Sequence, residues 1–153
     1  MLEQGSIFLF TLTRKISAKK EQIMNILNPP NWPRPRGYSN GISAKGRIVV
    51  TGGIVGWDEN ETFIEKDIAG QASQAFKNIV LILEEGDVKP ENIVRMTWYI
   101  TDKIGYINSQ KLIGESYRKN FGKHFPAMAV VEVVSLMEEE AKIEIEVMAI
   151  VEE

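Results

Sequence analysis

Three glutamates near the C-terminus have the residue type and spacing that acid–base chemistry needs. In KIEIEV (142–147), Glu144 and Glu146 alternate with apolar residues, so both side chains point to one side of a predicted strand. Glu132 lies in the alternating segment before it, HFPAMAVVEV (124–133), which we expect to form the neighbouring strand. Carboxylates at a partly buried surface can have separated pKa values and act as general acid and base. A solvated strand face or an intersubunit salt bridge is the alternative.

Candidate ligand-binding groups precede these acids in the chain. Arg36 lies in the stiff, proline-rich connector NPPNWPRPRG (28–37), and a guanidinium held there suits the capture of a ligand carboxylate. Tyr38 follows it and can hydrogen-bond a substrate or pack. Gly53 ends TGG, where backbone N–H groups can approach a ligand closely, although a tight bend explains the glycines equally well. A surface arginine in a polar connector is the alternative for Arg36.

Composition limits what these residues can do. The 153-residue chain contains no cysteine, which excludes thiol catalysis, disulfides and zinc–thiolate sites. His124 is the only histidine, so we expect no multi-histidine metal centre and interpret His124 as structural. The net charge of −3 gives no electrostatic reason to expect nucleic acid. We expect a cytoplasmic protein that uses no metal or cofactor and has neither a nucleic-acid nor a membrane partner.

Two periodicities predict the elements that position these residues. Helical spacing begins at Asp67 and ends at Gly86, and a second helix is predicted over 105–121. The first two alternating segments are expected to form a hairpin that turns near Lys45 and Gly46. The five predicted strands cover 38–44, 47–53, 93–101, 127–134 and 141–151.

The order β-β-α-β-α-β-β predicts an α+β fold with two helices on one face of the sheet. The other face then carries Met, Val, Ile and scattered carboxylates, and exposed apolar area of that kind marks an interface. We therefore expect a homo-oligomer. In the strand 127–134, the odd-numbered residues are expected to face the core. Met128, Val130 and Glu132 are expected to face a ligand cleft, with Phe125 beside them.

The first 30 residues are predicted to be an extension before a single domain at 31–153. SIFLFTLT (6–13) is apolar, but eight residues are far too few to span a membrane. Its basic residues follow the apolar run, the reverse of a secretory signal. An added edge strand and a loosely ordered extension are both open, as is translation from Met24.

Five segments together resemble the Rid (YjgF-type) family, whose members are also named endoribonuclease L-PSP. The resemblance covers about residues 36–151, in order and without large gaps. The segments are GYSNGI (37–42), IVVTGGIVGWD (48–58), QASQAFKNIVLILEEGDVKPENIVRMTWYITD (71–102), YRKNFGKHFPAMAVVEV (117–133) and AKIEIEVMAI (141–150).

The resemblance implies a chorismate-mutase-like α+β fold assembled as a homotrimer, with small-molecule sites in the clefts between subunits. It also implies hydrolysis of enamine and imine intermediates, released by pyridoxal-phosphate enzymes, to a 2-oxo acid and ammonia. Family members bring no cofactor of their own to this reaction.

One position departs from the family's deaminases. Their strand reads proline, small residue, arginine, and the arginine binds the substrate carboxylate; here Met128 stands in its place after Pro126. Losing such a charge-assisted hydrogen bond costs about 1.5 to 3 kcal/mol. Tyr38, Gly53 and Glu144 match the family's ligand-contacting tyrosine, its cleft-lining glycine and the glutamate that positions water.

Three functions follow from the resemblance. The first is an enamine or imine deaminase with an altered substrate range, in which Glu144 positions water, Tyr38 orients the substrate and Arg36 supplies the missing cation. The second is a non-catalytic trimer that either binds a small metabolite or has a regulatory role. Ribonuclease activity is ranked last, because the chain offers one histidine and no basic patch.

Overall fold

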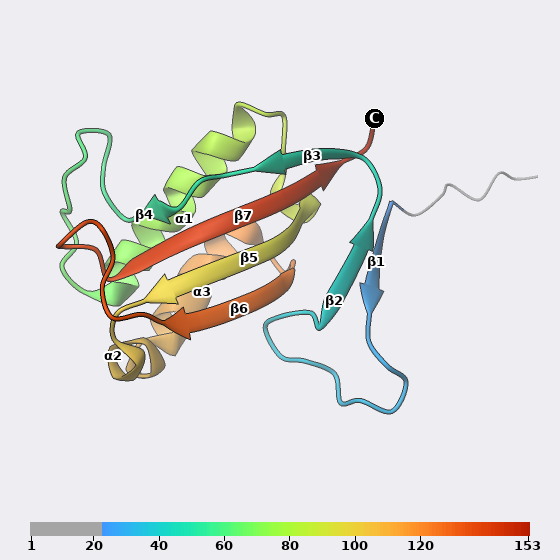
Figure 1. Cartoon of the computed structure of the whole chain (residues 1–153), viewed down its shortest axis with the longest axis horizontal. Coiled ribbons are helices and arrows are strands. Elements are labelled where there is room, and N and C mark those ends of the chain that lie inside the picture. Colours follow the sequence, from blue (N-terminus) through green and yellow to red (C-terminus); the bar gives the residue numbers. More distant parts are fainter. Residues whose placement is uncertain (1–22) are drawn as a thin grey trace, which may run out of the picture.

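One mixed sheet with helices on a single face forms the main body of the computed structural model, which describes residues 23–153 (Figure 1). The strands lie in the order β3-β7-β5-β6, and β4 also pairs with β7. The predicted α+β class, with helices on one side of the sheet, is confirmed. The five strands of this sheet are β3 (Arg47–Val50), β4 (Ile54–Val55), β5 (Ile93–Ile100), β6 (Ala127–Glu132) and β7 (Ile143–Val151).

The helix layer forms because its two longer helices each bury one apolar stripe. Helix α1 (Ile68–Glu84) buries a stripe that includes Phe76 and Ile79. It starts where the Asp67 carboxylate accepts a hydrogen bond from Gly70 N (2.7 Å), close to where the sequence predicts helical spacing to begin. The predicted helix over 105–121 is wrong as a single element. It is two helices that meet at Ser109, α2 (Lys103–Asn108) and α3 (Gln110–Phe121).

The predicted hairpin is also wrong. Strand β2 (Gly41–Ala44) pairs with β1 (Met24–Leu27) in a separate two-stranded ribbon, whereas β3 pairs antiparallel with β7 (Figure 1). Gly46 makes the change of sheet: its φ is +145° and a Cβ there would collide with the Val151 carbonyl oxygen. The chain does bend at Gly46 between the two strands, but the hydrogen-bond partners of both strands lie elsewhere in the chain.

The proline-rich connector links β1 to β2 and contains no helix. Residues 24–27, which fall inside the predicted extension, are therefore paired to a strand of the predicted domain. The expectations for SIFLFTLT (6–13) lie outside the described residues, and the domain boundary stays a prediction. Within residues 23–153, no helix is both long enough and apolar enough to span a membrane.

The direction in which β6 faces differs from the prediction. β6 runs parallel to β5, with Met128 opposite Met96 and Val130 opposite Trp98, and the two β5 residues are buried against the helices. Met128 and Val130 therefore lie on the helix-covered side of the sheet, and Met128 packs against the core. The odd-numbered residues of β6 lie on the uncovered side. The alternation along β6 correctly predicts which residues share a face. Pairing with the neighbouring strand β5 decides which of the two faces is covered by the helices.

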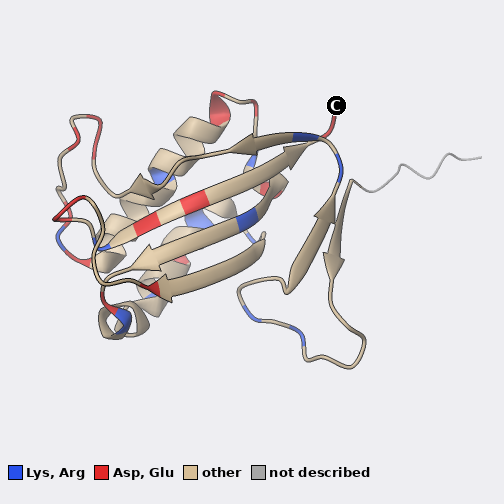
Figure 2. Ribbon diagram, in the orientation of Figure 1, with Lys and Arg blue, Asp and Glu red and all other residues tan. Residues whose placement is uncertain are grey.

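The uncovered face is apolar at its β3 side, as the sequence predicts. Ile48 and Val50 are 64% and 60% exposed, and Met148 on β7 is partly exposed next to them. Figure 2 shows the acidic positions of β7 and a basic position of β5 on a sheet that is otherwise mostly uncharged. Self-association through this face stays a prediction.

Candidate functional site

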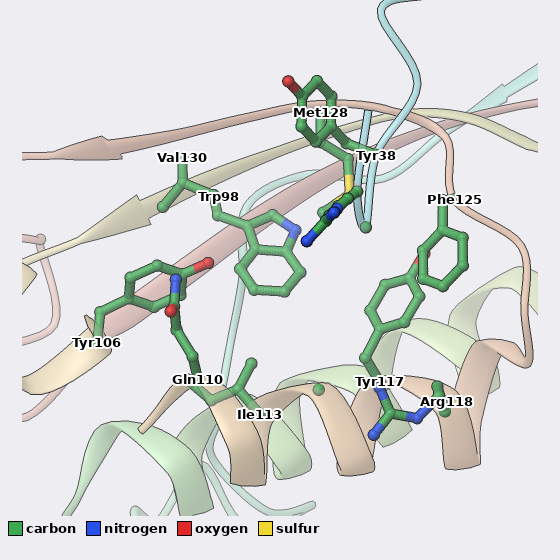
Figure 3. A pocket seen from close by; sticks show the side chains of 13 residues that line it. Tyr38, Trp98, Tyr106, Gln110, Ile113, Tyr117, Arg118, Phe125, Met128 and Val130 are labelled. Carbon is green, nitrogen blue, oxygen red and sulfur yellow. The ribbon is translucent and has the colours of Figure 1, made fainter. Parts of the chain in front are cut away.

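A pocket of about 620 Å³ opens between the edge strand β6, helix α3 and the end of the proline-rich connector (Figure 3). Its wall is aromatic and carries two arginines, and none of the thirteen described residues that line it is acidic. The lining residues are Arg36, Gly37, Tyr38, Trp98, Tyr106, Gln110, Ile113, Gly114, Tyr117, Arg118, Phe125, Met128 and Val130. A pocket with this electrostatic character favours an anionic ligand that has an apolar body.

Five of the eight predicted site residues lie in this pocket: Arg36, Tyr38, Phe125, Met128 and Val130. They come from segments almost a hundred residues apart in the sequence. In particular, Arg36 lines the same pocket as Met128. The pocket therefore has a guanidinium in its wall although position 128 carries no charge.

Hydrogen bonds hold the connector against β6 at this point. Ser39, which is buried, donates from its backbone N to the Pro126 carbonyl (2.9 Å) and from its hydroxyl to the Phe125 carbonyl (2.6 Å). These bonds fix the backbone directly after Arg36 and Tyr38. Both of those side chains are exposed, so they stand at the open side of the pocket.

Aromatic packing builds the wall between α3 and β6. Tyr117 stacks on Phe125, with ring centroids 5.8 Å apart and planes at 12°, and its hydroxyl donates to the His124 carbonyl (2.7 Å). Tyr106 stands edge-on to Trp98 at 6.4 Å. Burial raises the pKa of both Tyr106 and Tyr117 above the ordinary tyrosine value. Both hydroxyls therefore stay neutral at physiological pH, and the arginines set the charge of the pocket.

Sequence reasoning missed the contribution of α3. One stripe of α3 at four-residue steps, which includes Ile113 and Tyr117, is buried in the core. A second stripe at the same spacing, Gln110, Gly114 and Arg118, lines the pocket beside it. A Cβ at Gly114 would lie 3.4 Å from Arg118 Nη1, so the guanidinium lies back along the helix over the glycine. The sequence pattern that indicates this second stripe is a polar, a small and a polar residue at four-residue steps, next to the apolar stripe of the same helix.

Gly53 and Glu144 lie next to each other, but outside this pocket. A Cβ at Gly53 would collide with Glu144 Oε1, so this carboxylate lies directly over the glycine and would have to move if a larger residue stood there. Glu144 pairs in register with Tyr99 and therefore lies on the uncovered face of the sheet, opposite to the face that carries Met128. Within one chain, Gly53 and Glu144 are on the other side of the sheet from the pocket.

The remaining predicted acid, Glu132, is not in the pocket. Its Oε1 accepts a hydrogen bond from Lys103 N (2.8 Å) at the start of α2, which is a structural contact. The expectation that Glu132 and Glu144 occupy neighbouring strands is wrong, because β5 lies between β6 and β7. Glu146 accepts from the Tyr99 hydroxyl (3.2 Å) on the uncovered face.

The histidine has a structural contact as well. His124 Nε2 lies 2.6 Å from the Ile93 carbonyl oxygen, which holds the ring at the start of β5. Among residues 23–153, no three His, Cys, Asp or Glu side chains gather in a way that could hold a metal ion.

Comparison with known proteins identifies the family. The sequence model described as Endoribonuclease L-PSP matches residues 32–151, most of the chain. The chain belongs to the Rid (endoribonuclease L-PSP) family. It is 31% identical over 116 residues to the 2-iminobutanoate/2-iminopropanoate deaminase of Salmonella typhimurium, covering 74% of this chain and 86% of that protein.

Two further relatives match most of the chain, one in sequence and one in fold. A RutC family protein of Aquifex aeolicus is 36% identical over 128 residues, which cover 83% of this chain and 99% of that one. The crystal structure of the Rid-family protein YyfB of Yersinia pestis superposes with a TM-score of 0.75 at 23% identity, covering 85% of this chain and all of that one. The YjgF-type fold that the resemblance implied is confirmed.

Proposed function

We propose that this Rid-family chain hydrolyses 2-imino acids or their enamine forms to a 2-oxo acid and ammonia, with a substrate range that differs from that of the named deaminases. The observation that carries the proposal is the presence of Arg36 in the pocket that Met128 lines. A 2-imino acid presents a carboxylate, and a guanidinium binds it in a bidentate manner. The names of the relatives at about 30% identity support this reaction class.

The chemistry needs a base, an acid and water. The water oxygen adds to the carbon of the C=N bond, and the proton that water loses goes to Glu144. Transfer of that proton to the nitrogen gives a carbinolamine. The remaining hydroxyl proton then also passes to the nitrogen through Glu144, so that the C–N bond breaks, ammonia leaves and the C=O bond of the 2-oxo acid forms. Water is the only co-reactant, and Tyr38 orients the substrate at the mouth of the pocket. General acid–base catalysis of this kind contributes about 10² to 10⁴ in rate.

The catalytic arrangement requires two copies of the chain. Glu144 lies on the uncovered face and the pocket on the covered face, so one copy cannot present both to one ligand. Packing the exposed apolar residues of the uncovered face against another copy would bury them. The proposal requires that this contact place the neighbour's Gly53 and Glu144 at the pocket mouth. A homotrimer, as the family resemblance implies, is the proposed assembly.

The decisive test is release of ammonia from 2-imino acids generated in situ from amino acids. We expect purified protein to accelerate release at least tenfold over buffer for some members of a panel graded by side-chain size. Heat-denatured protein is the control. No acceleration for any carboxylate-bearing or neutral enamine would contradict the proposal and leave a metabolite-binding trimer, which the apolar lining around Met128 favours as the second candidate.

Met128→Arg is expected to increase the affinity for small 2-imino and 2-oxo acids about tenfold, because it adds a guanidinium to a pocket that already carries Arg36 and Arg118 and so strengthens its attraction for a carboxylate. Met128→Gln, which has similar length and no charge, is the matched control and should bring no gain. Calorimetric titration with pyruvate measures the change. Equal affinities of both folded variants would show that a cation at position 128 is not what the pocket lacks.

A further inference from the structure

One buried donor in the pocket has no acceptor. Trp98 is only 3% exposed, and its indole Nε1 has no hydrogen-bond partner. In residues 23–153, the one other buried side-chain nitrogen or oxygen without a partner is Ser116 Oγ, and Ser116 does not line the pocket. Figure 3 shows the Trp98 nitrogen turned toward the interior of the pocket, away from Tyr106.

An unpaired buried N–H is unfavourable, and buried donors in folded proteins almost always have an acceptor. A ligand that brings an acceptor to Trp98 recovers this free energy. Met128, a flexible side chain that is only partly buried, lines the pocket beside the indole and can move as the ligand enters. The donor and the mobile side chain thus mark the inner part of a binding site.

The size of the pocket adds a second constraint. A four-carbon 2-imino acid has about seven non-hydrogen atoms, and at roughly 30 Å³ each, the share of a water molecule in the liquid, it occupies about 200 Å³. The pocket volume of about 620 Å³ is about three times larger. The stacked rings of Tyr117 and Phe125 offer the additional space an apolar surface. A small substrate would leave that surface uncovered.

We infer that the pocket selects 2-imino and 2-oxo acids with a large, aromatic side chain, and that Trp98 Nε1 donates a hydrogen bond to the group at carbon 2. The inference rests on the proposed function for the choice of these acids. The carboxylate binds Arg36 at the mouth, the oxygen or nitrogen at carbon 2 accepts from Trp98, and the aromatic ring packs against Tyr117 and Phe125. Trp98 is thereby a specificity-determining residue.

Calorimetric titration of the full chain with three stable acids tests this without turnover. 3-Phenylpyruvate is expected to bind at least tenfold more tightly than pyruvate, because burial of the ring adds apolar contact. It should also bind about fivefold more tightly than 3-phenylpropionate, which lacks the acceptor at carbon 2. Equal binding of pyruvate and 3-phenylpyruvate would overturn the size selection, and equal binding of the two phenyl acids would overturn the role of the indole.

Two variants separate the hydrogen bond from the packing. Trp98→Phe is expected to weaken 3-phenylpyruvate about fivefold while leaving 3-phenylpropionate unchanged. Trp57→Phe, in a separate apolar cluster with Phe63, is the matched control and should change neither. Equal weakening of both acids by Trp98→Phe would overturn the donor role. Because binding is measured without catalysis, tight binding without ammonia release would contradict only the proposed hydrolysis, whereas hydrolysis without size selection would contradict only this inference.

Discussion

Glu144→Gln is expected to lower the rate of ammonia release about a hundredfold while leaving the affinity for a 2-oxo acid nearly unchanged. Glutamine keeps the shape of the side chain over Gly53 but cannot accept a proton from water. The loss corresponds to about 2.7 kcal/mol of transition-state stabilisation. Steady-state kinetics with the best imine of the panel, together with calorimetric binding of the corresponding 2-oxo acid, measures both quantities.

Glu146→Gln is the matched control for this variant. Glu146 lies two residues further along β7 on the same face, and its carboxylate accepts from the Tyr99 hydroxyl rather than lying over a glycine. Its replacement should change the rate less than threefold. If both variants lose activity equally, the effect belongs to the charge of the sheet face. If Glu144→Gln retains full activity, the proposed catalytic role is wrong.

Arg36→Ala is expected to weaken the binding of a 2-oxo acid by about 10- to 100-fold. None of the described residues that line the pocket is acidic, and Arg36 is the guanidinium that the connector brings into the wall that Met128 also lines. Its removal therefore takes away a charge-assisted pair with the ligand carboxylate. The methyl ester of the same acid carries no charge, and its affinity should change less than threefold. Calorimetric titration with the acid and its ester gives the comparison directly.

Arg34→Ala provides the control because Arg34 belongs to the same connector, two residues earlier, and lines a neighbouring pocket beside His124 instead. It should leave the affinity for the acid unchanged. Equal losses for Arg34→Ala and Arg36→Ala would show that only the general charge of the connector matters. In that case Arg118 on α3 becomes the remaining candidate for the carboxylate.

Much of the fold followed from local patterns. The apolar spacing of α1, and the alternation along β5 and β7, are local properties that side-chain periodicity expresses directly. Pairing is different, because it depends on residues far apart in the sequence. The expected hairpin is wrong for that reason: β2 pairs with β1, and β3 pairs with β7.

The candidate site divides in the same way. The residue types follow from the chain alone: a methionine at 128, an arginine at 36, a tyrosine at 38 and a glutamate at 144. That Arg36 lines the pocket with Met128 became visible only in the folded chain, where the Ser39 hydrogen bonds to Phe125 and Pro126 join the two segments. Such contacts between distant segments leave no periodic trace in the sequence.

The tertiary structure also decided which face each residue occupies. Alternation along a strand has a period of two, but it does not show which set of residues faces the helices. It therefore predicts that Met128 and Val130 lie on the same face of the sheet without predicting which face. Pairing of β6 with β5 placed them toward the helices, where Trp98 and α3 complete the pocket, and β7 carried Glu144 to the opposite face. The sequence thus specifies which reactive groups are present. Their position on opposite faces of the sheet, with Met128 on one face and Glu144 on the other, is a property of the folded molecule.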